Sequence, residues 1–261
     1  MRLGLCIEMA LTGLPFEDRI GKAAELGLRH VEFWFVDKSY RGTPKRLAAI
    51  AQQHAVTITN TVIGSPDGSI GGGLTNPAHR EEWIKRARMT IAFTREAQIP
   101  ATIVCTGNAV PGMTGEAMLA SVVEGLKPTV ELAEEAGVTL LLEPLNTACD
   151  HPGYWLTSSD LGAEICRRLG SKCMRLLFDC YHMQIMEGNL LQHIGRNLDV
   201  IGHFHMAGVP GRHEVQQGEI NYPYLLEKVA DMGYRGVFGL EYAPSCDDEA
   251  SIRETMNHLG I

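Results

Sequence analysis

TLLLEP (139–144) is an apolar run of strand length that ends in a carboxylate, Glu143. The pattern recurs three times, in runs that reach Asp179, His205 and Glu241: RLLFDC (175–180), VIGHFHM (200–206) and VFGLEY (237–242). The gaps of 36, 26 and 36 residues are each about one strand plus one helix long. Parallel strands joined by crossover helices all run in the same direction. We therefore expect the four side chains at the same end of four successive strands.

The same alternation of strand and helix spacing extends along the whole chain, and it predicts one α/β domain over residues 1–261, a (β/α)8 TIM barrel. A length of 261 residues is close to the ~250 typical of this fold. The expected strands are 3–7, 30–35, 57–62, 102–105, 139–142, 175–178, 200–205 and 237–240. The expected helices are 16–26, 44–54, 76–97, 115–136, 158–169, 190–197, 222–232 and 247–259.

An open, doubly wound sheet would give a similar alternation, but it predicts a glycine-rich phosphate turn after the first strand. That strand instead runs into IEMALTG (7–13). The triplet at 71–73 follows the third strand and opens no helix, so we expect a flexible loop there. Four helices are predicted to end in a left-handed glycine just before the next strand: Gly27, Gly137, Gly170 and Gly233.

The carboxyl end of the strands is the active-site face of a (β/α)8 barrel. Two Glu, one Asp and one His converging there form a site for a divalent cation such as Mg²⁺, Mn²⁺, Co²⁺ or Zn²⁺. The alternative is that each acid only caps the helix that follows it. The presence of all four residues at the same end of successive strands favours the metal site.

Composition restricts the partners of the protein. A formal net charge of −8 argues against nucleic-acid binding, which relies on clustered Lys and Arg. The seven Cys are scattered without a Cys-x-x-Cys pair, and we expect them to be reduced. No membrane segment or signal peptide is recognisable, so we expect a cytosolic protein that acts on small molecules. The sequence leaves a homo-oligomer open.

Further polar residues are expected on the same face. His182 lies three residues after Asp179, in the loop that follows the strand. Arg212, in the long segment after His205, could bind a substrate carboxylate or hydroxyl through its planar fork, or could be solvated. His203 shares a strand face with His205 but lies farther from the strand end, so we expect a packed, hydrogen-bonded residue.

The pattern of Glu143, Asp179-x-x-His182, His205 and Glu241 resembles the xylose-isomerase-like barrel superfamily of sugar isomerases and epimerases. AGVPGRHEVQQGEINYPYLLEKVADMGYRGVFGLEYAP (207–244) is similar to the C-terminal part of the hydroxypyruvate isomerase family, and residues 14–35 and 71–82 support this more weakly. The resemblance implies metal ligation by Glu143, Asp179, His205 and Glu241. It also implies an acid/base role for Glu143 and Glu241, and substrate contacts from His182 and Arg212.

One position departs from that family. The hydroxypyruvate isomerase group often has Gln where this chain has His205, whereas ketose 3-epimerases have His. The first hypothesis is that hydroxypyruvate and tartronate semialdehyde interconvert through an enediolate, with a divalent metal as Lewis acid. The alternatives are a ketose 3-epimerase and a lyase or dehydratase on the same ligands. A multi-zinc nuclease would need more His ligands and a basic groove, and a non-catalytic binding protein would not need all four.

Overall fold

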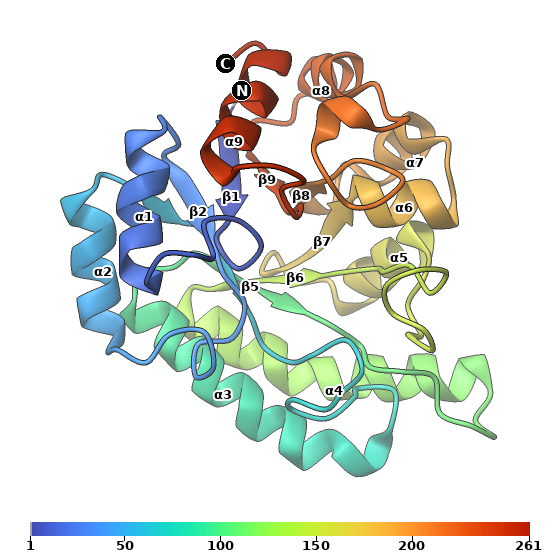
Figure 1. Cartoon of the computed structure of the whole chain (residues 1–261). Coiled ribbons are helices and arrows are strands. Elements are labelled where there is room, and N and C mark those ends of the chain that lie inside the picture. The colour runs from blue at the N-terminus through green and yellow to red at the C-terminus, as the bar shows by residue number, and fades with distance from the viewer. Residues whose placement is uncertain (1) are drawn as a thin grey trace.

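The computed structural model describes residues 2–261 and shows parallel strands enclosed by a ring of helices (Figure 1). Within these residues the strands are β1 (Arg2–Cys6), β2 (His30–Glu32), β3 (Thr57–Ile58), β4 (Asn60–Val62), β5 (Ala101–Val104), β6 (Thr139–Leu142), β7 (Met174–Asp179), β8 (Ile201–Met206) and β9 (Val237–Leu240). They form one sheet in the order β3-β2-β1-β9-β8-β7-β6-β5-β4.

The third predicted strand is present as two pieces, β3 and β4, separated only by Thr59. β2 pairs with β3, and β4 pairs with β5. Hydrogen bonds continue across the break, because Thr59 N donates to Val31 O at 2.8 Å and Val62 N donates to Trp34 O at 2.8 Å. The two pieces therefore act as one bent strand that joins the ends of the sheet. This closes the predicted eight-stranded barrel.

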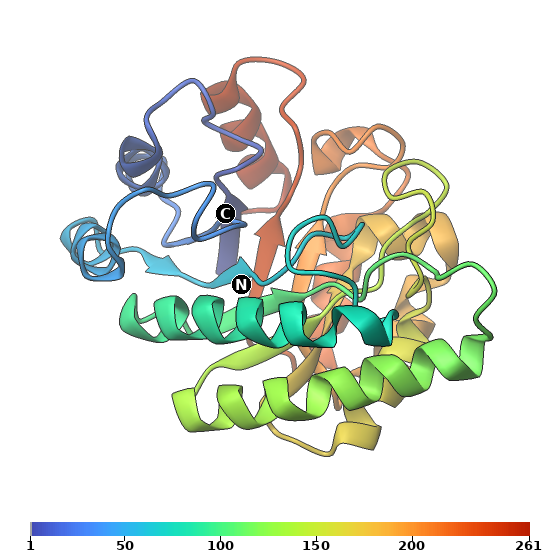
Figure 2. The same ribbon diagram turned by 90° about the horizontal axis from the view of Figure 1, so that it is seen from below.

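The helices cover the outside of the barrel, and α3 and α4 run side by side along it in both views (Figures 1 and 2). Within residues 2–261 they are α1 (Phe16–Glu25), α2 (Pro44–Gln53), α3 (Arg80–Glu96), α4 (Gly115–Ala136), α5 (Ser159–Leu169), α6 (Cys180–Met186), α7 (Leu190–Asn197), α8 (Tyr222–Asp231) and α9 (Asp248–His258). Short 3-10 helices lie at Pro77–His79 and Val215–Gln217. None of the helices in this part of the chain combines the length and apolar character needed to cross a bilayer.

Local sequence signals explain where the helices begin and end. Thr114 caps α4 by accepting a hydrogen bond from Ala117 N at 3.2 Å, and Ser158 caps α5 in the same way. The four glycines predicted to end helices all have positive φ, which confirms that prediction. Glycine is suited to this position because it has no Cβ to clash in the left-handed conformation.

Two local predictions were wrong. His182 lies in a helix, α6, rather than in a loop, because Asp179 caps this helix directly at the end of β7. The glycines at 71–73 are buried in a packed turn rather than in a flexible loop. Gly73 N donates to His79 Nδ1 at 3.2 Å, and the Cα of Gly73 lies against Gly107, in the segment after β5. Packing against the Gly107 backbone accounts for Gly73, whereas Gly71 and Gly72 have positive φ, at 85° and 74°, which favours glycine.

This packing predicts that Gly107→Ala is more destabilising than Gly112→Ala. Both glycines have positive φ, at 91° and 82°, so both substitutions should cost about 1–2 kcal/mol of backbone strain. A Cβ at Gly107 would lie 2.6 Å from the Cα of Gly73, whereas one at Gly112 would meet nothing within 4 Å. Overpacking should add about 1–3 kcal/mol at Gly107 alone. Urea unfolding of the two variants measures the difference, and equal losses would contradict the packing argument.

Candidate active site

The four residues expected to converge do so, at the carboxyl end of four neighbouring strands. Glu143 follows β6, Asp179 ends β7, His205 lies near the end of β8, and Glu241 follows β9. The strands are adjacent in the order β9-β8-β7-β6, and Asp179 pairs in register with His205. One ligand atom from each residue lies within 4.8 Å of the others, and all four residues are buried.

The imidazole of His205 is at the centre of this cluster. Its Nδ1 lies 3.4 Å from Glu143 Oε1, 3.4 Å from Glu241 Oε2 and 4.0 Å from Asp179 Oδ2. Neither Nδ1 of His205 nor Oε1 of Glu143 has a hydrogen-bond partner in the structure, although both atoms are buried. Buried polar atoms are rarely left unpaired without a reason.

A divalent metal would account for these unpaired atoms. Ligand atoms about 2.1 Å from a common ion lie roughly 3.0–3.4 Å apart when adjacent, and farther apart when opposite. The distances around His205 Nδ1 are compatible with that arrangement. Three carboxylates and one imidazole are also a donor set typical of Mn²⁺ and Mg²⁺ rather than of a thiolate-rich zinc site. The residues therefore fit a metal ion.

The helix cap and the expected metal ligation are compatible at Asp179, because its two oxygens face different partners. Oδ1 accepts hydrogen bonds from the backbone N–H groups of Tyr181 and His182, at 2.7 and 3.1 Å, and so caps α6. Oδ2 faces His205 in the cluster. One carboxylate can therefore begin a helix and also offer an oxygen to a cation.

The carboxylates differ in their electrostatics. Burial raises the pKa of Glu143 to about 7, and the neighbouring Glu241 and Asp179 add to the effect. Burial likewise raises the pKa of Asp179 to about 6. Glu241 is also buried, but His205 and Arg212 hold its pKa well below the usual range. The pKa of His205 is well above its ordinary value despite burial, because Glu32 and Glu241 favour the cation.

The cluster opens into a pocket of about 180 Å³. Much of its wall is apolar and comes from the first half of the chain: Trp34, Phe35, Val62, Ile103 and Cys105. Glu143, Glu241, His182, Arg212 and His151 bring polar groups to the same space. A mostly apolar cavity with a few convergent polar groups is the usual form of a small-molecule site.

Arg212 points inward rather than into solvent, and its side chain is 16% exposed. Its Nη2 donates to Glu241 Oε2 at 2.6 Å, and its guanidinium lies over the ring of Tyr181. The backbone of Arg212 has a φ of 58° and is tied to the segment after β9, because Ala243 N donates to Arg212 O at 2.9 Å. Glu214, two residues further on, accepts hydrogen bonds from Ser245 N in that segment and from Ser251 Oγ in α9, and these contacts tie the loop to both.

His182 lines the pocket with a defined tautomer. Its Nδ1 accepts a hydrogen bond from Asn146 N at 3.2 Å, so the proton of the neutral ring resides on Nε2. Burial, together with the charge of Arg212, lowers the pKa of His182 well below its ordinary value. Nε2 is buried without a hydrogen-bond partner and lies 3.6 Å from Asp179 Oδ2. His182 therefore offers a hydrogen-bond donor to a substrate oxygen.

Three residues of the site were not among the predicted ones. Trp34 Nε1 donates to Glu241 Oε1 at 3.0 Å, His151 lines the pocket, and Glu32 contacts His205. Glu32 and Trp34 lie two positions apart in HVEFWF (30–35), and this period-2 spacing was the available signal. His151 stands in an irregular segment, where no periodicity marks it.

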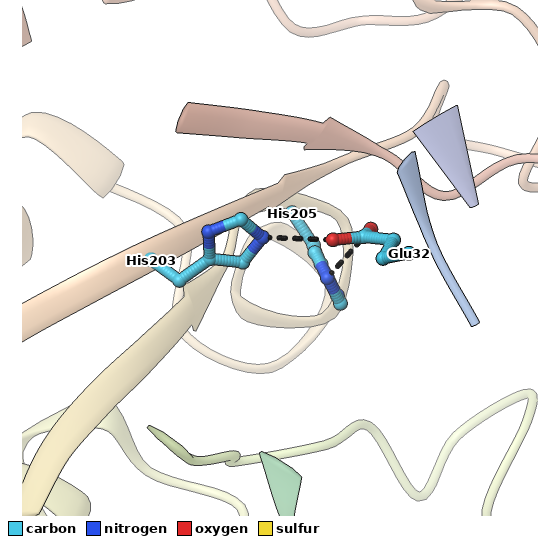
Figure 3. A group of neighbouring side chains, drawn as sticks. All are labelled: Glu32, His203 and His205. Carbon is cyan, nitrogen blue, oxygen red and sulfur yellow. Dashed lines mark hydrogen bonds and ion pairs between the residues drawn. The ribbon is translucent and has the colours of Figure 1, made fainter. Parts of the chain in front are cut away.

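His203 is buried and its Nε2 lies 3.0 Å from Glu32 Oε2, which confirms its predicted packed, hydrogen-bonded role. Figure 3 shows the carboxylate of Glu32 facing a ring nitrogen of both His203 and His205. The residues brought together are therefore the predicted six, Glu143, Asp179, His182, His205, Arg212 and Glu241, with a supporting group around Glu32.

Similarities to known proteins agree with this geometry. A family model described as "Xylose isomerase-like TIM barrel" matches residues 20–260. The 2-oxo-tetronate isomerase of Cupriavidus necator is 34% identical over 99% of both chains. The hydroxypyruvate isomerase of Escherichia coli is 30% identical over 97% of both chains.

Solved structures show the same architecture. A structure titled "AP endonuclease, family 2" from Brucella melitensis superposes with a TM-score of 0.89 at 26% identity, over 98% of both chains. An L-ribulose 3-epimerase superposes with a TM-score of 0.85 at 20% identity, over 99% of this chain and 93% of the other. By its family match and its near-full-length relatives, the chain belongs to the xylose isomerase-like TIM-barrel family of sugar isomerases and epimerases.

Proposed function

We propose that the protein is a metal-dependent isomerase of short 2-oxo hydroxy acids, such as hydroxypyruvate or 2-oxo-tetronate. The observation that carries this proposal is the buried cluster of three carboxylates and one imidazole, in which Glu143 and Glu241 also face the pocket. The names of the curated relatives supply the substrate class. Such an isomerisation moves a proton between adjacent carbons through an enediolate.

The metal would be held by Glu143, Asp179, His205 and Glu241, with Mn²⁺ or Mg²⁺ as the first choice for this donor set. When bound, it would polarise the substrate carbonyl and stabilise the negative charge of the enediolate. The apolar wall around Trp34, Val62 and Ile103 would exclude water from the reacting carbons.

Glu143 and Glu241 form the proposed acid/base pair, with unequal environments. Glu143 faces the pocket, and burial raises its pKa to about 7 in the metal-free protein, which makes it more basic than Glu241. We therefore assign the removal of the C–H proton to Glu143. Arg212 and Trp34 hold the two oxygens of Glu241, and we assign to Glu241 the proton transfer on the other side of the substrate.

Arg212 and His182 are the proposed substrate-binding residues. Nε of Arg212 is buried without a hydrogen-bond partner, while Nη2 is engaged by Glu241. A substrate carboxylate would bring Arg212 a second anionic partner, and the neutral His182 would donate through Nε2 to a carbonyl or hydroxyl oxygen.

A ketose 3-epimerase is the second candidate, and the specific observation in its favour is His205. This ring lies among the three carboxylates at the position where the epimerase pattern also has His. A lyase using the same ligands would begin with the same proton removal. A nuclease has less support, because the net charge is −8 and the cluster contains one imidazole rather than a histidine-rich set.

Metal binding should strengthen as pH rises from about 5.5 to 8. Glu143, with its pKa at about 7, and Asp179, with its pKa at about 6, are protonated at the lower pH and must lose protons to bind a cation. We expect Mn²⁺ affinity, measured by calorimetry, to rise at least ~10-fold over this range. Adding Mn²⁺ should also raise the melting temperature. A pH-independent affinity, or no binding at all, would contradict the assignment.

Glu143→Gln and Glu241→Gln should each lower kcat by at least ~10², the usual scale for a lost acid/base group. Assays use saturating Mn²⁺, so that weaker metal binding is separated from lost proton transfer. Glu164→Gln, which alters an exposed carboxylate on α5, is the matched control and should keep wild-type kcat. Near wild-type kcat in either test variant would remove that glutamate from the mechanism.

Arg212→Ala should raise KM for hydroxypyruvate about 10- to 150-fold, because a lost charge-assisted contact costs about 1.5–3 kcal/mol. Arg212→Lys should restore only part of this, since an ammonium lacks the planar fork. The wild-type kcat/KM for hydroxypyruvate is compared with those for D-fructose, D-tagatose and L-ribulose. A ketose preferred by more than about tenfold, with exchange of its C3 proton in D2O, would support the epimerase instead.

A further inference from the structure

Glu32 stands inside the barrel with its two oxygens facing different groups. Oε1 lies 3.0 Å from Nε2 of His205. Oε2 is surrounded by donors: it accepts a hydrogen bond from Asn60 Nδ2 at 2.7 Å and lies 3.0 Å from His203 Nε2 and 3.3 Å from Thr59 Oγ1. Oε2 is thus positioned by side chains of the barrel wall, and Oε1 contacts His205 (Figure 3).

A glycine on one of the intervening strands leaves room for the contact between Glu32 and His205. Glu32 is on β2 and His205 on β8, and β1 and β9 lie between these strands in the sheet. On β9 the residue in register with His205 is Gly239. A Cβ at Gly239 would clash with Glu32 Oε1 and lie 2.9 Å from His205 Cδ2. A side chain at this position is therefore incompatible with the Glu32–His205 pair.

A neutral imidazole carries one proton and one lone pair, so the hydrogen bond on one nitrogen decides which nitrogen can bind a cation. His205 Nε2 lies 3.0 Å from Glu32 Oε1 as an ion-pair contact, and a proton kept on Nε2 by this carboxylate leaves the lone pair on Nδ1. This is the nitrogen that faces Glu143, Glu241 and Asp179. We propose that Glu32 is a positioning residue, which fixes the tautomer and orientation of His205 for metal binding. The metal-binding part of this proposal rests on the function proposed above.

The same three residues, Glu32, His203 and His205, are close enough to be considered as a second ion site. That assignment is less consistent with the contacts. Oε2 of Glu32 already accepts a hydrogen bond from Asn60, and His205 would need both ring nitrogens as ligands. A carboxylate that supports His205 through the contact at Nε2, and that is itself held by Asn60, accounts for all of these contacts.

Glu32→Gln tests the role with almost no change in shape. Asn60 and Thr59 donate toward the Oε2 position, so the amide oxygen of Gln should lie there and its NH2 should face His205 Nε2. Two donors would then oppose each other. The ring must rotate or move its proton to Nδ1, and either change removes the Nδ1 lone pair from the cluster.

The experiment measures Mn²⁺ affinity by calorimetry for the wild type, Glu32→Gln, Gly239→Ala, and Glu32→Gln combined with His205→Asn. We expect Glu32→Gln and Gly239→Ala each to weaken binding about 10- to 100-fold, the usual scale for loss of such a supporting partner. In the His205→Asn background, Glu32→Gln should add no further loss, because its effect acts through that ring. A merely structural role would give additive losses.

The matched control is Glu187→Gln, which alters a carboxylate that accepts hydrogen bonds from Ser159 N and Oγ, away from the cluster. It should lower thermal stability without changing Mn²⁺ affinity. Wild-type affinity in Glu32→Gln, or additive losses in the double variant, would overturn the proposal.

Crystal structures of the metal-free wild type and Glu32→Gln provide a readout that does not require metal. A displaced or rotated His205 ring in the variant supports the positioning role, and an unmoved ring with unchanged hydrogen-bond partners overturns it. If the wild type binds no Mn²⁺, the proposed function loses its metal, and these two structures still decide the role of Glu32.

Discussion

Repulsion among buried carboxylates is the constraint on which the rest of this site depends. Glu143, Asp179 and Glu241 meet in a space with little access to water, where like charges interact strongly and an uncompensated anion is costly. His205 faces all three. Burial is the main cause of the raised pKa values of Glu143 and Asp179, the neighbouring Glu241 adds to it, and a bound cation would offset both effects.

Groups from the surrounding loops and strands contact the charged residues of the cluster and fix their positions. Arg212 is brought in from the loop after β8 and pairs with Glu241, and the hydrogen bonds around Glu214 hold that loop against α9. Glu32 holds the opposite edge of the His205 ring. Asp179 is fixed by the first turn of α6. Glu241, His205 and Asp179 therefore have separate anchors on the barrel, which position the cluster without neutralising it completely.

The sequence was sufficient for the barrel and for the convergence of six site residues, because strand ends are regularly spaced and parallel strands align them. It was insufficient for contacts that depend on which distant segments meet. Glu32 and His203 are 171 positions apart, and only the closed barrel places them together. His182 was assigned to a loop because Asp179 begins α6 immediately, without any intervening turn residues. The glycines at 71–73 gave no sign that another backbone would pack on them.

The charged cluster and the apolar wall of the pocket come from different halves of the chain, and this separation affects how a new substrate specificity could arise. All four members of the charged cluster come from β6 to β9, whereas the apolar wall comes largely from the segments around β2, β4 and β5. Substitutions at Val62 or Ile103 can therefore reshape the cavity for a longer or shorter carbon chain while the charge-bearing half stays unaltered. Glu32 and Trp34 are exceptions, since they belong to the shaping half yet contact His205 and Glu241. The two halves can diverge independently only if these contacts are retained.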